Sequence, residues 1–199
     1  METTAPIVLP ISGNPLRVWG KVASDLVKAR LTLMVVLTTW MGYSLGSSEA
    51  SDGRTCLHAI LGTSLLAAGA SALNQWWERD LDALMRRTAF RPIPAGLLSP
   101  LTVLAFGVVV SLVGLAWLAF SVNLLTAFLG AVTLAIYVFA YTPLKRTTEL
   151  NTWVGAVPGA IPPLMGWTAA TGDFGAGGWA LFAILFFWQL PHFMAIAWL

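Results

Sequence analysis

Three oxygen-bearing side chains recur every four residues near the end of an apolar segment. Asn74, Glu78 and Asp82 lie at positions i, i+4 and i+8. On a helix with 3.6 residues per turn these positions drift by only about 40° per step, so the three side chains line one face. Proteins usually hold Mg²⁺ through one or two carboxylates together with substrate phosphates and retained waters. The spacing therefore predicts a site for Mg²⁺ and a diphosphate substrate.

A cluster of arginines follows the same face. Its members are Arg79, Arg86, Arg87 and Arg91. Planar guanidinium groups bind phosphate oxygens through paired hydrogen bonds, so the cluster is suited to hold a diphosphate. The alternative is that these arginines only fix the membrane topology and form ion pairs with the nearby acids. Asp80 projects about 120° or more away from Asn74 around the helix, so we expect it to be a purely structural acid.

The composition is that of a membrane protein. Hydrophobic residues make up 57% of the chain and charged residues 10%, and the mean hydropathy is +0.76. All three values differ from those of soluble globular chains. Apolar runs of about 20 residues, long enough to span a bilayer, can be read at six places. They are 31–45 with a backward extension to about residue 22, 57–77, 101–120, 124–141, 153–170 and 179–199. We expect an all-α, polytopic transmembrane bundle of about six spans, with residues 1–199 forming a single domain.

Basic residues gather at alternate ends of these runs. Arg17, Lys21, Lys28 and Arg30 precede or enter the first run, the arginine cluster follows the second, and Lys145 and Arg146 follow the fourth. By the positive-inside rule, the N-terminus and these loops are predicted to be cytoplasmic. Regions 74–91 and 141–151 then share one surface and can face each other over a common site. Because topology and phosphate binding account for the basic residues, the net charge of +2 does not indicate a nucleic-acid partner.

Prolines interrupt the last two apolar runs. Pro158, Pro162 and Pro163 lie in the fifth run and Pro191 in the sixth. Each proline removes a helix hydrogen bond. In membranes such breaks persist where neighbouring helices or a cavity accommodate the freed carbonyls, so a hollow bundle is one interpretation. The other is ordinary packing, since proline is common in membrane helices.

Three segments in order resemble one known family. They are Asn74-x-x-x-Glu78-Arg-Asp-x-Asp82 with Met85-Arg-Arg-Thr88-x-x-Arg91-Pro92, then Tyr141-Thr-Pro-Leu-Lys145-Arg-Thr-Thr-Glu-Leu-Asn151, then Trp188-Gln-Leu-Pro-His192-Phe. Together they resemble the intramembrane prenyltransferases of the UbiA type, and among these the protohaem IX farnesyltransferases, or haem O synthases. The resemblance runs from about Lys28 to the last residue.

The resemblance implies roles for particular residues. Asn74, Glu78 and Asp82 would hold the Mg²⁺ that bridges farnesyl diphosphate, with Glu78 standing where the wider family has Asp. Lys145 would contact the diphosphate, and Tyr141 would face the reacting allylic end. The further substrate-binding candidates are Arg30, Arg79, Arg86, Arg91 and His192. For His192, which lies inside an apolar run, contact with haem and a hydrogen bond to a neighbouring helix remain alternatives.

The implied reaction transfers a farnesyl group to a vinyl group of protohaem IX, and water capture then gives haem O and diphosphate. Protohaem is a substrate, and no side-chain nucleophile is required. The resemblance also implies an integral protein of the cytoplasmic (inner) membrane, in contact with the lipid bilayer, with haem A synthase or a terminal oxidase assembly as candidate partners. A sister enzyme acting on a quinone or chlorophyll precursor is an alternative, and a membrane transporter is another. Because the family fold has about nine helices and a second Asp-rich motif, we expect this chain to be C-terminally truncated and inactive alone.

Overall fold

The computed structural model describes residues 15–48, 52–145, 148 and 150–198. Within these residues the chain is helical and contains no strand. The helices are α1 (Pro15–Leu26), α2 (Ala29–Gly46), α3 (Gly53–Asp82), α4 (Pro100–Ser121), α5 (Leu124–Ala135), the π-helix η1 (Ile136–Tyr141), α6 (Thr142–Leu144), α7 (Asn151–Thr171) and α8 (Ala176–Trp198). The prediction of an all-α bundle is confirmed.

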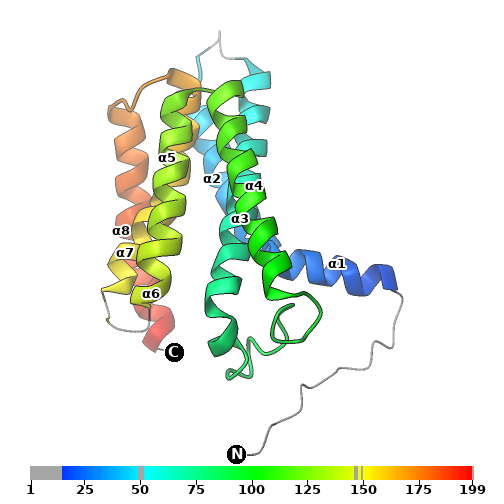
Figure 1. The fold of residues 1–199 in the computed structure, drawn as a ribbon. Helices are drawn as coiled ribbons and strands as arrows, with labels where there is room; N and C mark the ends of the chain where they lie inside the picture. Colours follow the sequence, from blue (N-terminus) through cyan, green and yellow to red (C-terminus); the bar gives the residue numbers. More distant parts are fainter. Residues whose placement is uncertain (1–14, 49–51, 146–147, 149, 199) are drawn as a thin grey trace, which may run out of the picture.

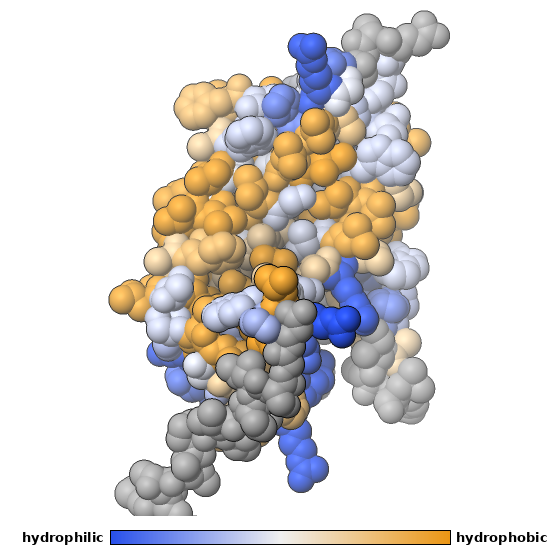
Figure 2. Space-filling model, turned by 90° about the vertical axis from the view of Figure 1, so that its right-hand side faces the viewer, coloured by the Kyte–Doolittle hydropathy of each residue, from blue (hydrophilic) through white to orange (hydrophobic). Residues whose placement is uncertain are grey.

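Long helices occupy all six places where the sequence predicts spans. Four are long and apolar enough to cross a membrane: α3, α4, the continuous segment Leu124–Leu144 and the Ala176–Ala195 part of α8. The other two, α2 and α7, have 18 and 21 residues. Figure 1 shows the long helices running side by side. In Figure 2 a broad apolar band crosses the molecule between hydrophilic residues at its two ends, as expected for a bundle that spans a bilayer.

The predicted backward extension of the first span is wrong. The helix breaks between α1 and α2, where Lys28 adopts a left-handed backbone with φ of 47°, and α1 lies across the axis of the bundle (Figure 1). The break deprives the last carbonyls of α1 of their regular helical donors, and the Asp25 carbonyl keeps only a 3.4 Å bond from the Lys28 amide. Gln75 of α3 compensates, because its Nε2 donates to the carbonyls of Asp25 at 2.9 Å and Leu26 at 2.8 Å.

Glycines bring two helix pairs into close contact. A Cβ added at Gly69 of α3 would collide with the Ser111 hydroxyl of α4, and one at Gly107 would come within 2.9 Å of Leu73. On the other side, a Cβ at Gly42 of α2 would collide with the main-chain carbonyl of Pro163 in α7. Small residues at membrane helix contacts allow such backbone approach. These contacts fix α3 against α4 and α2 against α7, and the site lies between these pairs.

Candidate active site

The polar face of α3 is buried within the bundle. The exposed fractions of Asn74, Glu78 and Asp82 are 2%, 4% and 1%. The three positions lie on one side of the helix because the four-residue spacing is close to the helical period. Charged groups inside a membrane bundle are costly unless they are paired or bind a ligand. The partners of these three side chains therefore define the site.

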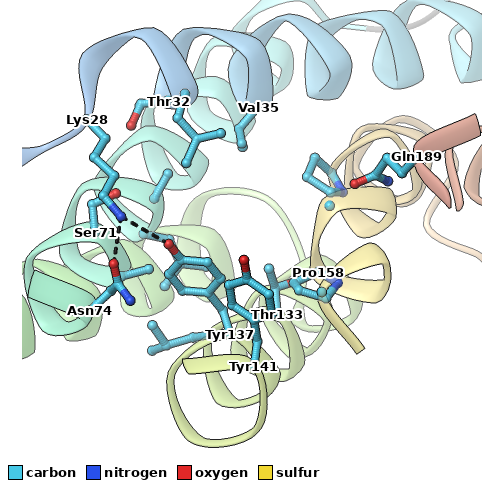
Figure 3. A pocket seen from close by; sticks show the side chains of 18 of the residues that line it. Lys28, Thr32, Val35, Ser71, Asn74, Thr133, Tyr137, Tyr141, Pro158 and Gln189 are labelled. Atoms are coloured by element: carbon cyan, nitrogen blue, oxygen red, sulfur yellow. Dashed lines mark hydrogen bonds between the residues drawn. The ribbon is translucent and has the colours of Figure 1, made fainter. Parts of the chain in front are cut away.

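Lys28 reaches Asn74 from the break between α1 and α2. Its Nζ donates to Asn74 Oδ1 at 2.6 Å and to the Tyr137 hydroxyl at 3.4 Å (Figure 3). The Asn74 amide nitrogen donates to Thr142 Oγ1 at 3.2 Å, which fixes the side-chain orientation. Burial, together with the nearby positive charge of Arg91, lowers the pKa of Lys28 to about 8. An anion bound here would favour the charged ammonium.

The two carboxylates pair with cations from two different loops. Lys145 Nζ lies 3.3 Å from Glu78 Oε1. Arg91 Nη1 lies 2.5 Å from Asp82 Oδ2 and 3.7 Å from Glu78 Oε2. Residues from 74–91 and from 141–151 thus meet, which confirms the prediction that these regions face each other.

The chain after α3 folds back on itself to bring Arg91 to this point. The main-chain amides of Thr88 and Ala89 donate to the Met85 carbonyl, and the Thr88 hydroxyl donates to the Asp82 carbonyl at 3.0 Å. These turns reverse the chain within nine residues of Asp82. They hold the guanidinium against both carboxylates.

A π-helix presents two aromatic rings beside this polar end. The Thr142 main-chain amide donates to the Tyr137 carbonyl five residues earlier, and the Thr142 hydroxyl donates to the same oxygen at 2.8 Å. Tyr137 and Tyr141 stack with ring centroids 5.6 Å apart and planes 20° from parallel. Short π-helical segments inside α-helices often occur at functional sites. The tyrosine pair forms part of a cavity wall (Figure 3).

A cavity of about 690 Å³ extends from the polar end into the bundle. Its volume lies within the range of small-molecule sites. Lys28, Asn74 and Lys145 line one end, whereas Glu78, Asp82 and Arg91 are not among the lining residues. Glu78 adjoins this end through its ion pair with Lys145, and Arg91 joins Glu78 to Asp82. The remaining wall is largely apolar and comes from α2, α3, α5, η1, α7 and α8. Since Pro158 and Pro162 line it, the hollow-bundle interpretation of the prolines is supported.

The donor set at the polar end fits Mg²⁺. Asn74, Glu78 and Asp82 supply hard oxygen atoms, and Asp82 Oδ1 is buried with no hydrogen-bond partner in the described chain. A buried carboxylate oxygen without a partner indicates a missing cation or donor. Among the described residues, no group of three or more His, Cys, Asp or Glu side chains could hold a metal.

The structure does not bring every predicted substrate-binding residue to the cavity. Arg79 lies over the Trp76 ring at 5.1 Å and 3.7 Å from Asp80, away from Glu78. Arg86 and Arg30 are exposed and do not line the cavity.

His192 is also exposed and absent from the cavity wall. Its ring stacks on Trp188 with centroids 4.7 Å apart. Asp80, whose side chain is 84% exposed, lies apart from the Asn74 face as expected.

Sequence reasoning missed several residues that the cavity gathers. The sequence pattern assigns Lys28 only to membrane topology and gives Tyr137 and Gln189 no role, although all three line the cavity. The spacing of Tyr137 and Tyr141, one helical turn apart, was a usable signal for two side chains on one face. The contact of Lys28 with Asn74 spans 46 residues of sequence and has no local signal.

The chain is similar in sequence to several known proteins and in fold to solved structures. Proteins named protoheme IX farnesyltransferase from Solibacter usitatus and Anaeromyxobacter sp. are 49% and 51% identical to the chain, covering 88% and 86% of it. The chain spans 63% and 58% of their lengths.

A mitochondrial protoheme IX farnesyltransferase from Arabidopsis thaliana is 44% identical over 87% of the chain and 40% of its own length. The fold is similar to that of a UbiA homologue from Archaeoglobus fulgidus solved with DMAPP and Mg²⁺, with a TM-score of 0.70 and 16% identity. That match covers 88% of this chain and 62% of the homologue. The sequence model of the UbiA prenyltransferase family matches residues 35–199. The chain therefore belongs to the UbiA prenyltransferase family.

Proposed function

We propose that the protein transfers a farnesyl group from farnesyl diphosphate to a vinyl group of protohaem IX, giving haem O and diphosphate. The observation that carries the proposal is a cluster of two carboxylates, an amide and three cations at one end of a largely apolar cavity. A prenyl diphosphate has the matching form, with a charged head and a long apolar tail. The cluster would hold the head, and the cavity would hold the tail.

Three cations would bind the diphosphate. Lys28 donates a hydrogen bond to Asn74, and Lys145 and Arg91 form ion pairs with Glu78 and Asp82. Their ammonium and guanidinium groups can also donate to phosphate oxygens. Breaking the C1–O bond of an allylic diphosphate builds negative charge on the leaving group. Fixed positive groups at that end stabilise the charge and lower the barrier.

Asn74, Glu78 and Asp82 would hold Mg²⁺, and the ion when bound would neutralise diphosphate oxygens as a Lewis acid. The unpartnered Asp82 Oδ1 supports this assignment. The solved homologues from Archaeoglobus fulgidus are bound to Mg²⁺ with DMAPP or GPP. Arg91 and Lys145 pair with the two carboxylates and would orient them before the substrate arrives.

The cavity walls would protect the allylic cation. Water would capture that cation before the acceptor could react, so a dry site is needed. The stacked rings of Tyr137 and Tyr141 lie next to Lys28 and Lys145, where the C1 end of the substrate would sit. The face of an aromatic ring stabilises a cation that lies within about 6 Å of the ring centroid.

Protohaem is proposed as the acceptor because the relatives that are 44–51% identical to the chain carry the name protoheme IX farnesyltransferase. We further propose that residues 1–199 form one domain of an integral protein of the cytoplasmic membrane. The N-terminus and the polar loops would face the cytoplasm, where the basic residues gather. Haem A synthase or a terminal oxidase assembly is the proposed partner that receives the product.

An acceptor competition tests the proposal. The full-length protein in lipid nanodiscs would receive farnesyl diphosphate, Mg²⁺ and one acceptor at a time: protohaem, a quinone precursor or a chlorophyll precursor. We expect farnesylated haem with release of one diphosphate per product. Farnesylation of a quinone or chlorophyll precursor with none of protohaem would contradict the proposed acceptor and assign the protein to a sister activity.

A further inference from the structure

Gln189 of α8 lines the cavity in the segment after Trp188, and the proposed function assigns it no role. Its Nε2 donates to the main-chain carbonyls of Leu185 at 3.1 Å and Ala156 at 3.4 Å. These two bonds occupy the nitrogen and leave Oε1 as a hydrogen-bond acceptor. The amide lies directly against Gly159 of α7, where a Cβ would collide with Oε1.

Two glycines of α7 place this amide next to the tyrosine wall. A Cβ at Gly155 would come within 2.6 Å of the Tyr141 ring, just as one at Gly159 would meet Gln189. The two glycines are four residues apart, so the ring and the amide lie about 6 Å apart along the helix. Figure 3 shows Gln189 across the cavity from Lys28, with Pro158 on the same side as Gln189. Gln189 thus lies opposite the cationic end but within one turn of Tyr141.

A second acceptor lies at the same place. The main-chain carbonyl of Gly159 receives no helical hydrogen bond, because its donors at i+3 and i+4 would be Pro162 and Pro163, which have no N–H. Gly159 itself lines the cavity. Two other wall hydroxyls are already committed, since Thr32 donates to the Val27 carbonyl and Thr133 to the Leu129 carbonyl.

The proposed reaction needs a site that holds a water molecule by hydrogen bonds, because water adds to a cation in its last step. When the allylic C1–O bond breaks, its electron pair leaves with the diphosphate, and the vinyl π electrons form the new C–C bond. The positive charge then sits on the vinyl carbon attached to the porphyrin. That cation either loses a proton to give an alkene or takes the lone pair of a water oxygen and releases one proton to give an alcohol.

We propose that Gln189 positions the water molecule that adds to this cation. A water that donates one proton to Gln189 Oε1 and the other to the Gly159 carbonyl has its lone pair free for the cation. A water molecule inside a protein needs at least two hydrogen-bond partners, and these two acceptors supply them. The proton lost on C–O bond formation passes to the diphosphate end of the cavity, and no oxidant or reductant takes part. Gln189 is thus a positioning residue for the alcohol product, and the inference rests on the proposed function.

The test is the ratio of alcohol to alkene product formed by the full-length protein from farnesyl diphosphate and protohaem in ¹⁸O-water. Gln189→Leu keeps the side-chain size and removes the acceptor. We expect the ratio of alcohol to alkene to fall roughly tenfold. This is the effect of losing one hydrogen bond that favours water addition over proton loss. Gly159→Ala, which displaces the amide from the other helix, should shift the ratio in the same direction. Gln189→Asn, which keeps an acceptor oxygen, should recover part of the alcohol.

Gln75→Leu is the matched control. Gln75 also binds two main-chain carbonyls through Nε2, but it does not line the cavity. This variant should lower stability without changing the product ratio. An unchanged ratio in Gln189→Leu overturns the inference. Loss of both products from Gln189→Leu and Gly159→Ala also overturns it, because the amide would then act before water capture. If the wild-type protein forms no farnesylated haem, the proposed function itself fails.

Discussion

The two oxygens of Asp82 lie in different surroundings. Oδ2 pairs with Arg91, whereas Oδ1 is buried without a hydrogen-bond partner among the described residues. A carboxylate in this state is held in place by one cation and remains able to bind a second one. Asp80, two residues earlier, is exposed and lies 3.7 Å from Arg79. Asp82 and Asp80 therefore allow a carboxylate of the site to be compared with a surface carboxylate on the same helix.

Asp82→Asn should lower the rate of Mg²⁺-dependent diphosphate release by at least about a hundredfold, because one charge that binds the metal is lost while the shape is kept. The measurement is the steady-state rate at several Mg²⁺ concentrations. Asp80→Asn is the matched control and should stay within about twofold of the wild type, as expected for a surface ion pair. Equal rates for the two variants would remove Asp82 from the proposed metal site.

Lys28 and Arg30 are two residues apart but differ in where they point. Lys28 reaches Asn74 inside the bundle, whereas Arg30 is exposed. Lys28→Met should therefore raise the KM for farnesyl diphosphate about tenfold, through loss of one charged hydrogen bond. Arg30→Met should leave it unchanged. A rise in KM with Arg30→Met alone would show that Arg30 binds the diphosphate and that Lys28 does not.

At the scale of helices, the close contact of α2 and α7 closes the cavity. A Cβ at Gly166 would collide with the Thr39 carbonyl, so the two backbones touch just beyond the last wall residues, Val35 and Met165. On α3 the last wall residue is Thr63, whose hydroxyl is buried and has no hydrogen-bond partner in the part of the chain that the structure describes. Thr63 lies eleven residues from Asn74, or about 16 Å along the helix. A farnesyl main chain of twelve carbons extends about 13 Å, at about 1.2 Å per bond as in an extended polypeptide.

The closed end should therefore limit the length of the prenyl chain. Thr63→Phe fills the end of the cavity, so we expect the preference to shift from farnesyl to geranyl diphosphate by about tenfold in kcat/KM. Leu61→Phe is the matched control, because Leu61 lies on the same helix and is 42% exposed. This variant should keep the wild-type preference. An unchanged preference in Thr63→Phe would mean that the tail does not reach this end.

At the scale of the whole molecule, the sequence predicts the helices well because hydropathy and helical period are local properties. All six apolar runs become long helices. The break at Lys28 was not predicted, because the group that compensates for it, Gln75, lies about 50 residues away. Local hydropathy contains no information about such a partner.

The site could be predicted only in part for the same reason. The shared face of Asn74, Glu78 and Asp82 follows from the helix period alone. The meeting of Lys145 with Glu78 follows from topology. The direction of Arg79 depends on its contact with Trp76, and that of Gln189 on two glycines of another helix. Such choices are set by tertiary packing, so the sequence could not separate Lys28 from Arg30 or Gln189 from His192.

The most direct test of the account is haem extraction and mass analysis from cells that lack their own haem O synthase and express the full-length protein. We predict a haem carrying a hydroxyethylfarnesyl group from the wild type and from Asp80→Asn, and protohaem alone from Asp82→Asn at equal amounts of membrane protein. Only protohaem from all three, or the farnesylated haem from Asp82→Asn at the wild-type level, would contradict the claim that this polar face and cavity form a haem farnesylation site.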